Sequence, residues 1–151
     1  MSKSILFYEE FLANGYLSNF ASCPIMLKGQ LWPTTEHYYQ AQKYIDNETQ
    51  EIIRRAPSPM NAKELTRLPQ YPPRSDWDAI KDDVMRDVLL AKFSQHDHLR
   101  TLLLETGDAN LVEHTANDDY WADAGDGSGK NRLGKLLMEV RERLRIEFNS
   151  V

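Results

Sequence analysis

Two long segments of the chain carry apolar side chains at helical spacing, and this pattern constrains the fold more than any other feature. In the segment 75–91, the apolar residues at this spacing are Trp77, Ile80, Val84, Val88 and Ala91. In the segment 131–148, they are Leu133, Leu136, Leu137, Val140 and Leu144. Intervals of three and four residues place side chains on one face of an α-helix, which is stable when that face is buried. The sequence therefore predicts two long helices, each with one apolar face.

Capping signals predict shorter helices elsewhere in the chain. They are expected over residues 33–45, 47–55, 58–68 and 98–105. A threonine N-cap precedes Glu36 in the first of them, Asn47 is expected to cap the second, and Ser58 stands before a proline in the third. Gly107 favours the end of the fourth helix, because glycine readily adopts the conformation that follows a helix. The prolines of residues 69–74 cannot continue a helix and predict a loop.

Short apolar runs predict strands at residues 5–8 and 111–114 and a hairpin with arms at 24–27 and 30–32. The intervening Lys28 and Gly29 are typical of a tight hairpin turn. The fold class expected from these elements is α+β, a helix-dominant single domain over residues 1–151 with a small antiparallel sheet. The length of 151 residues and the hydrophobic content of 41% suffice for one buried core.

Charge and cysteine content restrict the partners and the compartment. The formal net charge is −5, which argues against a protein that coats nucleic acid, although a few local cations suffice for a small phosphorylated ligand. Cys23 is the single cysteine, so neither an intramolecular disulfide nor a cysteine zinc cluster can form. The four histidines lack metal-binding spacing, and no apolar run predicts a signal peptide or a membrane helix. We expect a soluble, cytoplasmic protein with no metal, no membrane association and no obligatory protein partner.

Glu36 and Lys43 form the first candidate for chemistry. They are separated by two helical turns, which places both side chains on one helix face. The plainer interpretation is that Glu36 complements the helix dipole in the first turn and that Lys43 is a solvated surface charge. Spacing alone favours this plainer interpretation over a catalytic one.

A glycine-rich segment, residues 125–134, forms the second candidate. A glycine loop that leads into a helix offers backbone N–H groups to a phosphate, and Lys130 and Arg132 add positive charge there. The glycine spacing matches neither a P-loop nor a dinucleotide-binding fold. A flexible turn explains the pattern as well as a phosphate site does.

Acidic and aromatic side chains form the third candidate. Asp118 and Asp119 precede Tyr120 and Trp121, and a carboxylate beside apolar rings can have a raised pKa that suits acid–base catalysis. An aspartate-rich turn anchored by an aromatic ring is the competing interpretation. Trp77 has the same ambiguity, because its helical spacing favours a core position while an indole can also stack on a base.

Taken in order along the chain, these segments resemble the YbiA-like, or NADAR, family. The matching residues are 15–20, 32–43, 74–77, 84–85, 92–93, 102–108, 111–113, Asp118, Trp121, the glycine loop and 131–138. They extend from about Phe7 to Leu144, and the two long matches are specific. One departure is Ala122, where the family usually has glycine, so a locally different path is expected before the loop.

The resemblance implies hydrolysis of N-glycosidic bonds. In the bacterial YbiA-like branch, the implied substrates are early riboflavin-biosynthesis intermediates, in which a pyrimidine carries a ribosylamino 5′-phosphate. A related branch removes ADP-ribose from modified guanine bases, which would be the one form of nucleic acid expected as a partner. A non-catalytic module that binds ADP-ribose or a nucleotide is a third hypothesis.

The resemblance also implies roles for particular residues. Glu36, Trp77 and Asp118 fall on active-site positions of the family, and Lys43 matches a lysine proposed to form a Schiff base with the opened sugar. On this hypothesis the two carboxylates stabilise the sugar cation and move the proton, in an order left open, while Trp77 stacks on the base. No step requires a cofactor. The expected substrate-binding residues are Asn19, Phe20, Gly127, Gly129, Lys130 and Asn131.

Overall fold

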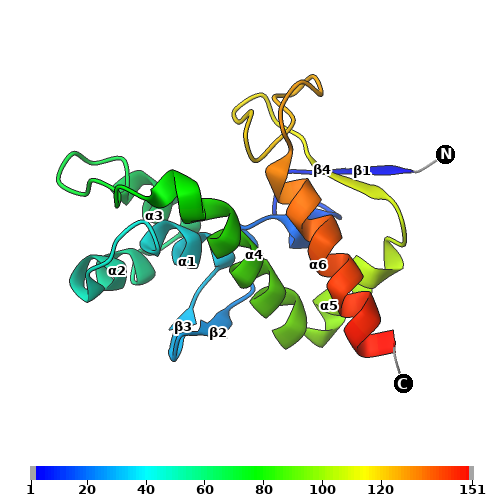
Figure 1. Ribbon diagram of the computed structural model, residues 1–151, viewed down its shortest axis with the longest axis horizontal. Helices are drawn as coiled ribbons and strands as arrows, with labels where there is room; N and C mark the ends of the chain where they lie inside the picture. Colours follow the sequence, from blue (N-terminus) through cyan, green and yellow to red (C-terminus); the bar gives the residue numbers. More distant parts are fainter. Residues whose placement is uncertain (1–2, 150–151) are drawn as a thin grey trace. The chain divides into compact units, whose positions relative to one another are not determined.

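The computed structural model describes residues 3–149 and divides the chain into two compact units. One unit is formed by residues 22–92, and the other by residues 1–21 together with 93–151. Figure 1 labels the helices and strands of both units.

The unit 22–92 begins with a hairpin and continues through helices. Strands β2 (Ile25–Leu27) and β3 (Gln30–Trp32) pair in antiparallel register, with Ile25 opposite Trp32. The turn residues Lys28 and Gly29 have φ values of 54° and 76°. Positive φ at both positions defines the turn type that matches the twist of a hairpin, so the expected hairpin is confirmed. The helices that follow are α1 (Thr35–Ala41), α2 (Asn47–Arg54), α3 (Pro59–Leu65) and most of α4 (Trp77–Gln95).

Side-chain caps start the three short helices. Thr34 and Ser58 accept backbone N–H bonds at the starts of α1 and α3, as the sequence predicts. At α2 the cap is Asp46, whose carboxylate accepts the N–H of Thr49, so the expectation that Asn47 is the cap is wrong by one residue. Helix α1 ends at Ala41, before the predicted residue 45, because the backbone then makes i→i+3 bonds that tighten the last turn.

Helix α4 buries a different set of side chains from the one that the periodicity suggests. Trp77 and Val88 are buried as expected, but Ile80, Val84 and Ala91 are only half-buried. The other buried residues of this helix are Met85, Leu89, Lys92 and Phe93. Two overlapping series with helical spacing pass through Val88, and spacing alone cannot decide between them.

The other unit joins the two ends of the chain in a parallel strand pair. Strand β1 (Ser4–Phe7) lies beside β4 (Asn110–Glu113), with Ile5 opposite Leu111 (Figure 1). The single turn η1 (Gly15–Leu17) and the helices α5 (Asp97–Glu105) and α6 (Arg132–Asn149) complete the unit. Both predicted strands are therefore present, but they pair with each other in parallel, in addition to the antiparallel hairpin.

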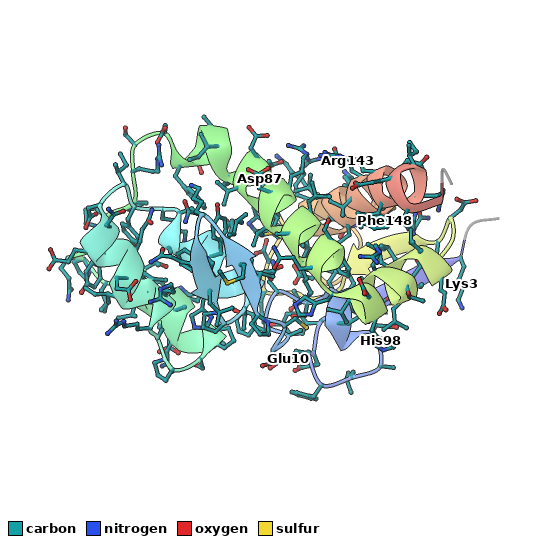
Figure 2. The ribbon with its side chains drawn as sticks, turned by 90° about the horizontal axis from the view of Figure 1, so that it is seen from below. Lys3, Glu10, Asp87, His98, Arg143 and Phe148 are labelled. Carbon is teal, nitrogen blue, oxygen red and sulfur yellow. The ribbon has the colours of Figure 1, made fainter. Side chains whose placement is uncertain are left out.

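Helix α6 packs its apolar face inward as predicted. Leu133, Leu136, Leu137, Val140 and Leu144 are all buried. Gly134 allows the helix to approach β4 closely, because a Cβ atom at this position would overlap the carbonyl oxygen of Leu111. Near the other end of α6, the guanidinium of Arg100 on α5 lies 3.9 Å from the ring centroid of Phe148, which Figure 2 labels.

The molecule belongs to the α+β class, with helices predominant and a small antiparallel sheet, as the sequence predicts. Among the described residues, no helix combines the length and the apolar character needed to cross a membrane.

Candidate functional site

Glu36 is a buried carboxylate in the first turn of α1. Only 7% of the residue is exposed, and its Oε2 accepts a hydrogen bond of 2.6 Å from Nε2 of Gln40. A glutamate that serves only to complement the helix dipole can do so at the surface, where its charge remains hydrated. Burial of an ionisable carboxyl costs free energy and therefore favours a further role for Glu36.

Gln40 connects Glu36 to a second polar group. Its Oε1 lies 3.0 Å from the hydroxyl of Thr66, the residue that follows α3. The same hydroxyl lies 3.5 Å from Nζ of Lys43. A chain of polar contacts therefore runs from Glu36 through Gln40 and Thr66 to Lys43. Sequence analysis assigned no role to Gln40 or Thr66; the i, i+4 spacing of Glu36 and Gln40 is the signal that could have identified Gln40.

Lys43 lies between the polar chain and two aromatic rings. Its Nζ is 5.8 Å from the ring centroid of Tyr39 and 5.9 Å from that of Trp77. Burial lowers the pKa of Lys43; the carboxylate of Glu36 opposes this shift, while the positive charges of Arg67, Lys63 and Lys81 add to it. A lowered pKa increases the fraction of neutral, nucleophilic amine near neutral pH.

Trp77 is both a packed residue and a neighbour of the candidate lysine. It is 8% exposed, and its ring meets that of Tyr39 edge-on, with centroids 5.1 Å apart. The core position that the periodicity favours is confirmed. The structure thus brings together three of the predicted residues, Glu36, Lys43 and Trp77, within the unit 22–92.

Asp118 belongs to the other unit and organises a turn. Its Oδ1 accepts the backbone N–H groups of Tyr120 and Trp121, each at 2.8 Å. This geometry is that of the aspartate turn which sequence analysis set against a catalytic role. Oδ2 does not take part in these two bonds, so the turn does not use the whole carboxylate.

The glycine loop does not offer the free backbone donors that the sequence suggests. The N–H groups of Gly127 and Gly129 both donate to the carbonyl of Asp123, and that of Lys130 donates to Asp119. The first amides of α6 are also engaged, since Arg132 donates to Tyr120 and Leu133 donates to Trp121. In this conformation the loop therefore lacks the physical basis of a backbone phosphate cradle.

Asp123 is the residue that closes this loop. Its carboxylate accepts the N–H groups of Thr115 and Gly125, at 3.1 and 2.8 Å, and lies 2.7 Å from Nδ1 of His114. Burial raises the pKa of Asp123, but the bonds from His114, Gly125 and Thr115 outweigh burial and leave it lowered. Sequence analysis missed Asp123, because its partners become apparent only when the loop is folded.

The side chain of Asn131 is also used within the protein. Its Oδ1 accepts the N–H of Glu113, and its Nδ2 donates to the carbonyl of Leu111, so both groups hold the backbone of β4. This bonding argues for a structural role in place of the expected substrate contact. The ammonium of Lys130 is exposed and lies 5.6 Å from the ring centroid of Tyr120. The charge of Lys130 is therefore accessible to a ligand.

The remaining predicted positions lie in the same unit as the loop. Asn19 is buried and Phe20 is half-buried, in the segment that follows η1. Ala122 is buried and does not have positive φ; the left-handed residues of this region are Ala124, Gly125, Gly127 and Asn131. The first residue with positive φ in this region is therefore Ala124, two residues after Ala122, where the chain departs from the family pattern.

Metal-binding side chains do not cluster in the part of the chain that the structure describes. Residues 3–149 contain no group of three His, Cys, Asp or Glu side chains that could hold an ion. Figure 2 shows His98 on the outside of α5, where it is exposed.

Comparisons with known proteins show extensive similarity. The NADAR domain model matches residues 6–145. N-glycosidase YbiA of Escherichia coli (strain K12) is 54% identical over 143 residues, which cover 95% of this chain and 89% of that protein. Riboflavin biosynthesis protein VVA0006 of Vibrio vulnificus (strain YJ016) is 46% identical over 144 residues, covering 95% of this chain and 39% of that protein. The NMR structure of E. coli YbiA superposes with a TM-score of 0.91 at 52% identity and covers 100% of this chain and 90% of that chain.

Proposed function

Because the chain belongs to the NADAR family, we propose that it hydrolyses the N-glycosidic bond between ribose 5-phosphate and the pyrimidine of early riboflavin-biosynthesis intermediates. Two relatives, an N-glycosidase and a riboflavin biosynthesis protein, support this reaction and this substrate class. We also propose that the two units act as one domain, since the family model extends over both.

The observation that carries the proposal is the arrangement around Glu36. A buried carboxylate accepts a hydrogen bond from a glutamine, and a lysine of lowered pKa lies beside an indole ring. Such an arrangement is costly for a stable fold and useful for chemistry, because displaced pKa values and buried charges concentrate at active sites. If Glu36 and Lys43 were only solvated surface charges, neither side chain would require these contacts.

The chemistry follows from the charge that develops when the bond breaks. As the bond between C1′ and nitrogen lengthens, its electron pair leaves with the pyrimidine and positive charge builds on the ribose. A carboxylate beside C1′ lowers the barrier electrostatically, and a proton must reach the departing nitrogen while water adds to C1′. We assign the carboxylate of Glu36 to these tasks, with Trp77 against the base; a role for Asp118 in the same reaction stays a prediction from the resemblance.

Lys43 offers a second route through the opened sugar. When the ribose ring opens, C1′ is held to the base nitrogen as a protonated imine; the neutral amine of Lys43 can add to C1′, and the base amine then leaves with a proton as an imine to Lys43 forms. Water hydrolyses that imine, which releases ribose 5-phosphate and regenerates the amine. Burial lowers the pKa of Lys43 and favours the neutral amine, whereas the rings of Tyr39 and Trp77, with centroids 5.8 and 5.9 Å from Nζ, attract its charged form.

Hydrolysis of ADP-ribosyl bonds is the second candidate function. A ligand with two phosphates requires more positive charge than one with a single phosphate. The positive charges of Lys63, Arg67 and Lys81 act on Lys43 and favour this candidate, whereas the formal net charge of −5 does not. A binding module that leaves ADP-ribose intact is the remaining possibility. We further propose a small-molecule substrate and a cytoplasmic enzyme, in keeping with the half-buried free thiol of Cys23.

Substitution of Glu36 tests the proposal directly. The purified protein is incubated with the riboflavin intermediates, and release of ribose 5-phosphate and free pyrimidine is followed. We predict that Glu36→Gln lowers turnover by about 10²–10⁴-fold, because the charge that stabilises the transition state is removed while its shape is kept. Thermal unfolding of the variant should remain cooperative.

Glu48→Gln is the matched control, since Glu48 also occupies a first helical turn but is exposed on α2. Its turnover should equal that of the unchanged protein. Cleavage of ADP-ribosylated guanosine without release from the riboflavin intermediates would favour the second candidate. Absence of cleavage of both substrates would contradict the enzymatic proposal and favour a binding module.

A further inference from the structure

Three positively charged side chains, those of Lys63, Arg67 and Lys81, act on the candidate lysine, Lys43. Thr66, whose hydroxyl lies 3.5 Å from Nζ of Lys43, stands between Lys63 and Arg67 in the sequence. Thr66 retains helical φ and ψ after α3, so residues 63, 66 and 67 share one face of that turn. Lys81 lies one turn after Trp77 on α4, and the ring of Trp77 borders Lys43. All of these residues belong to the unit 22–92.

Among the described residues, two of these three cations, Lys63 and Arg67, are not neutralised by an acidic partner. Within residues 3–149, neither Lys63 nor Arg67 makes an ion pair, whereas Arg54, Arg74 and Arg86 each pair with a carboxylate. Lys81 pairs with the exposed Asp78 at 3.2 Å. The buried carboxylate of Glu36 raises the pKa of Lys43, whereas the three cations Arg67, Lys63 and Lys81 lower it.

Like charges gathered in this way raise the free energy of the unliganded protein. Each cation near Lys43 makes protonation of Lys43 less favourable, and the cost is larger because Lys43 is partly withdrawn from water. An anionic ligand would neutralise Lys63 and Arg67, which make no ion pair within residues 3–149. Arginine and lysine beside a hydroxyl are the usual protein groups that bind a phosphate dianion.

We propose that Lys63 and Arg67, together with Lys81 and the hydroxyl of Thr66, form the site that binds the phosphate of the substrate beside Lys43. This inference rests on the proposed function for the identity of the ligand, a sugar phosphate. It also replaces the glycine loop as the phosphate site, because the amides of that loop are bonded within the protein. The planar guanidinium of Arg67 can bind two phosphate oxygens at once, whereas Lys63 contributes a point charge.

Binding of ribose 5-phosphate tests the site without requiring turnover. Its dissociation constant is measured by calorimetry for the unchanged protein and for Lys63→Gln, Arg67→Gln and the double variant, with ribose as the phosphate-free probe. Each single substitution should weaken binding of ribose 5-phosphate by about tenfold, and the double substitution by more. Arg55→Gln is the matched control, since Arg55 is an exposed arginine at the end of α2. Its binding should remain within about twofold of the unchanged protein.

The outcomes separate this inference from the proposed function. If the protein cleaves its substrate and binding falls in the Lys63 and Arg67 variants, both are supported. If binding falls in these variants but no substrate is cleaved, the phosphate site stands and the proposed reaction fails. If cleavage occurs while the variants bind ribose 5-phosphate as tightly as the unchanged protein, the inference is overturned. A loss confined to Lys130→Gln would also overturn it and return the phosphate to the glycine loop.

Discussion

At the scale of single residues, Gln40 determines how the carboxylate of Glu36 is oriented in the candidate site. Its amide donates to the carboxylate of Glu36 and faces the hydroxyl of Thr66 on the other side. An amide held at both ends has one orientation available to it, and a carboxylate bonded to that amide is fixed in turn. Gln40 is therefore a positioning residue that acts through Glu36.

We predict that Gln40→Met lowers kcat by about 10–100-fold while KM changes little, because Glu36 loses its fixed orientation but the binding groups remain. A carboxylate that loses a hydrogen-bond donor is protonated more readily, so the acid limb of the pH–rate profile should move to higher pH. A purely structural residue would not move this limb. Gln70→Met, at an exposed loop position, is the control, and an unchanged kcat in Gln40→Met would contradict the assignment.

At the scale of secondary-structure elements, close packing and helix propensity oppose each other at Gly134. This residue lies in the first turns of α6, where alanine would be favoured over glycine by about 1 kcal/mol. The neighbouring strand β4 leaves no space for a Cβ atom, which would overlap both the carbonyl of Leu111 and the side chain of Asn131. Overlap with a backbone carbonyl cannot be relieved by a change of rotamer, so packing should prevail.

We predict that Gly134→Ala lowers the free energy of unfolding by about 2–3 kcal/mol, as measured by urea denaturation. Arg143→Ala on the same helix, an exposed position labelled in Figure 2, should change stability by less than about 0.5 kcal/mol. A Gly134→Ala protein that is more stable than the parent would show that propensity outweighs packing and that α6 does not approach β4 this closely.

At the scale of the whole molecule, the chain builds one unit from its two ends and the other from residues 22–92. The predicted catalytic residues are divided accordingly, with Glu36, Lys43 and Trp77 in one unit and Asp118 in the other. A fully buried lysine, Lys92, ends the unit 22–92, with an exposed fraction of 0%. Burial lowers the pKa of Lys92 to about 8, while the nearby Cys23 opposes the shift. Stability of the molecule should therefore depend on pH in the alkaline range.

We predict that stability rises between pH 8 and pH 10 because of Lys92. Below about pH 8 this lysine is protonated in both the folded and the unfolded chain, so it contributes no pH dependence. Above that pH the folded chain has lost a proton that the unfolded chain, with a pKa near 10.5, still holds, so stability increases with pH. Urea unfolding at pH 7.5 and 9.5 measures the rise, which Lys92→Met should abolish. Lys135→Met, an exposed control, should preserve it.

Local chemistry allowed the sequence by itself to determine most of the secondary structure. The caps Thr34 and Ser58, the turn at Lys28 and Gly29 and the apolar face of α6 all depend on residues within a few positions of one another. The α+β class follows from these elements. The candidates Glu36, Lys43 and Trp77 were also identified from the sequence, but through resemblance, since spacing favoured a plainer interpretation.

Only the tertiary structure decided which of those side chains meet and which amides remain free. The parallel pairing of β1 with β4, the contact between Gln40 and Thr66, and the bonds that Asp123 makes within the glycine loop join residues whose proximity no periodicity encodes. The cations around Lys43 come from two separate segments of the unit 22–92, the end of α3 and the helix α4. Electrostatic and hydrogen-bond energies depend on distance and burial, and both quantities are set by the folded path of the chain.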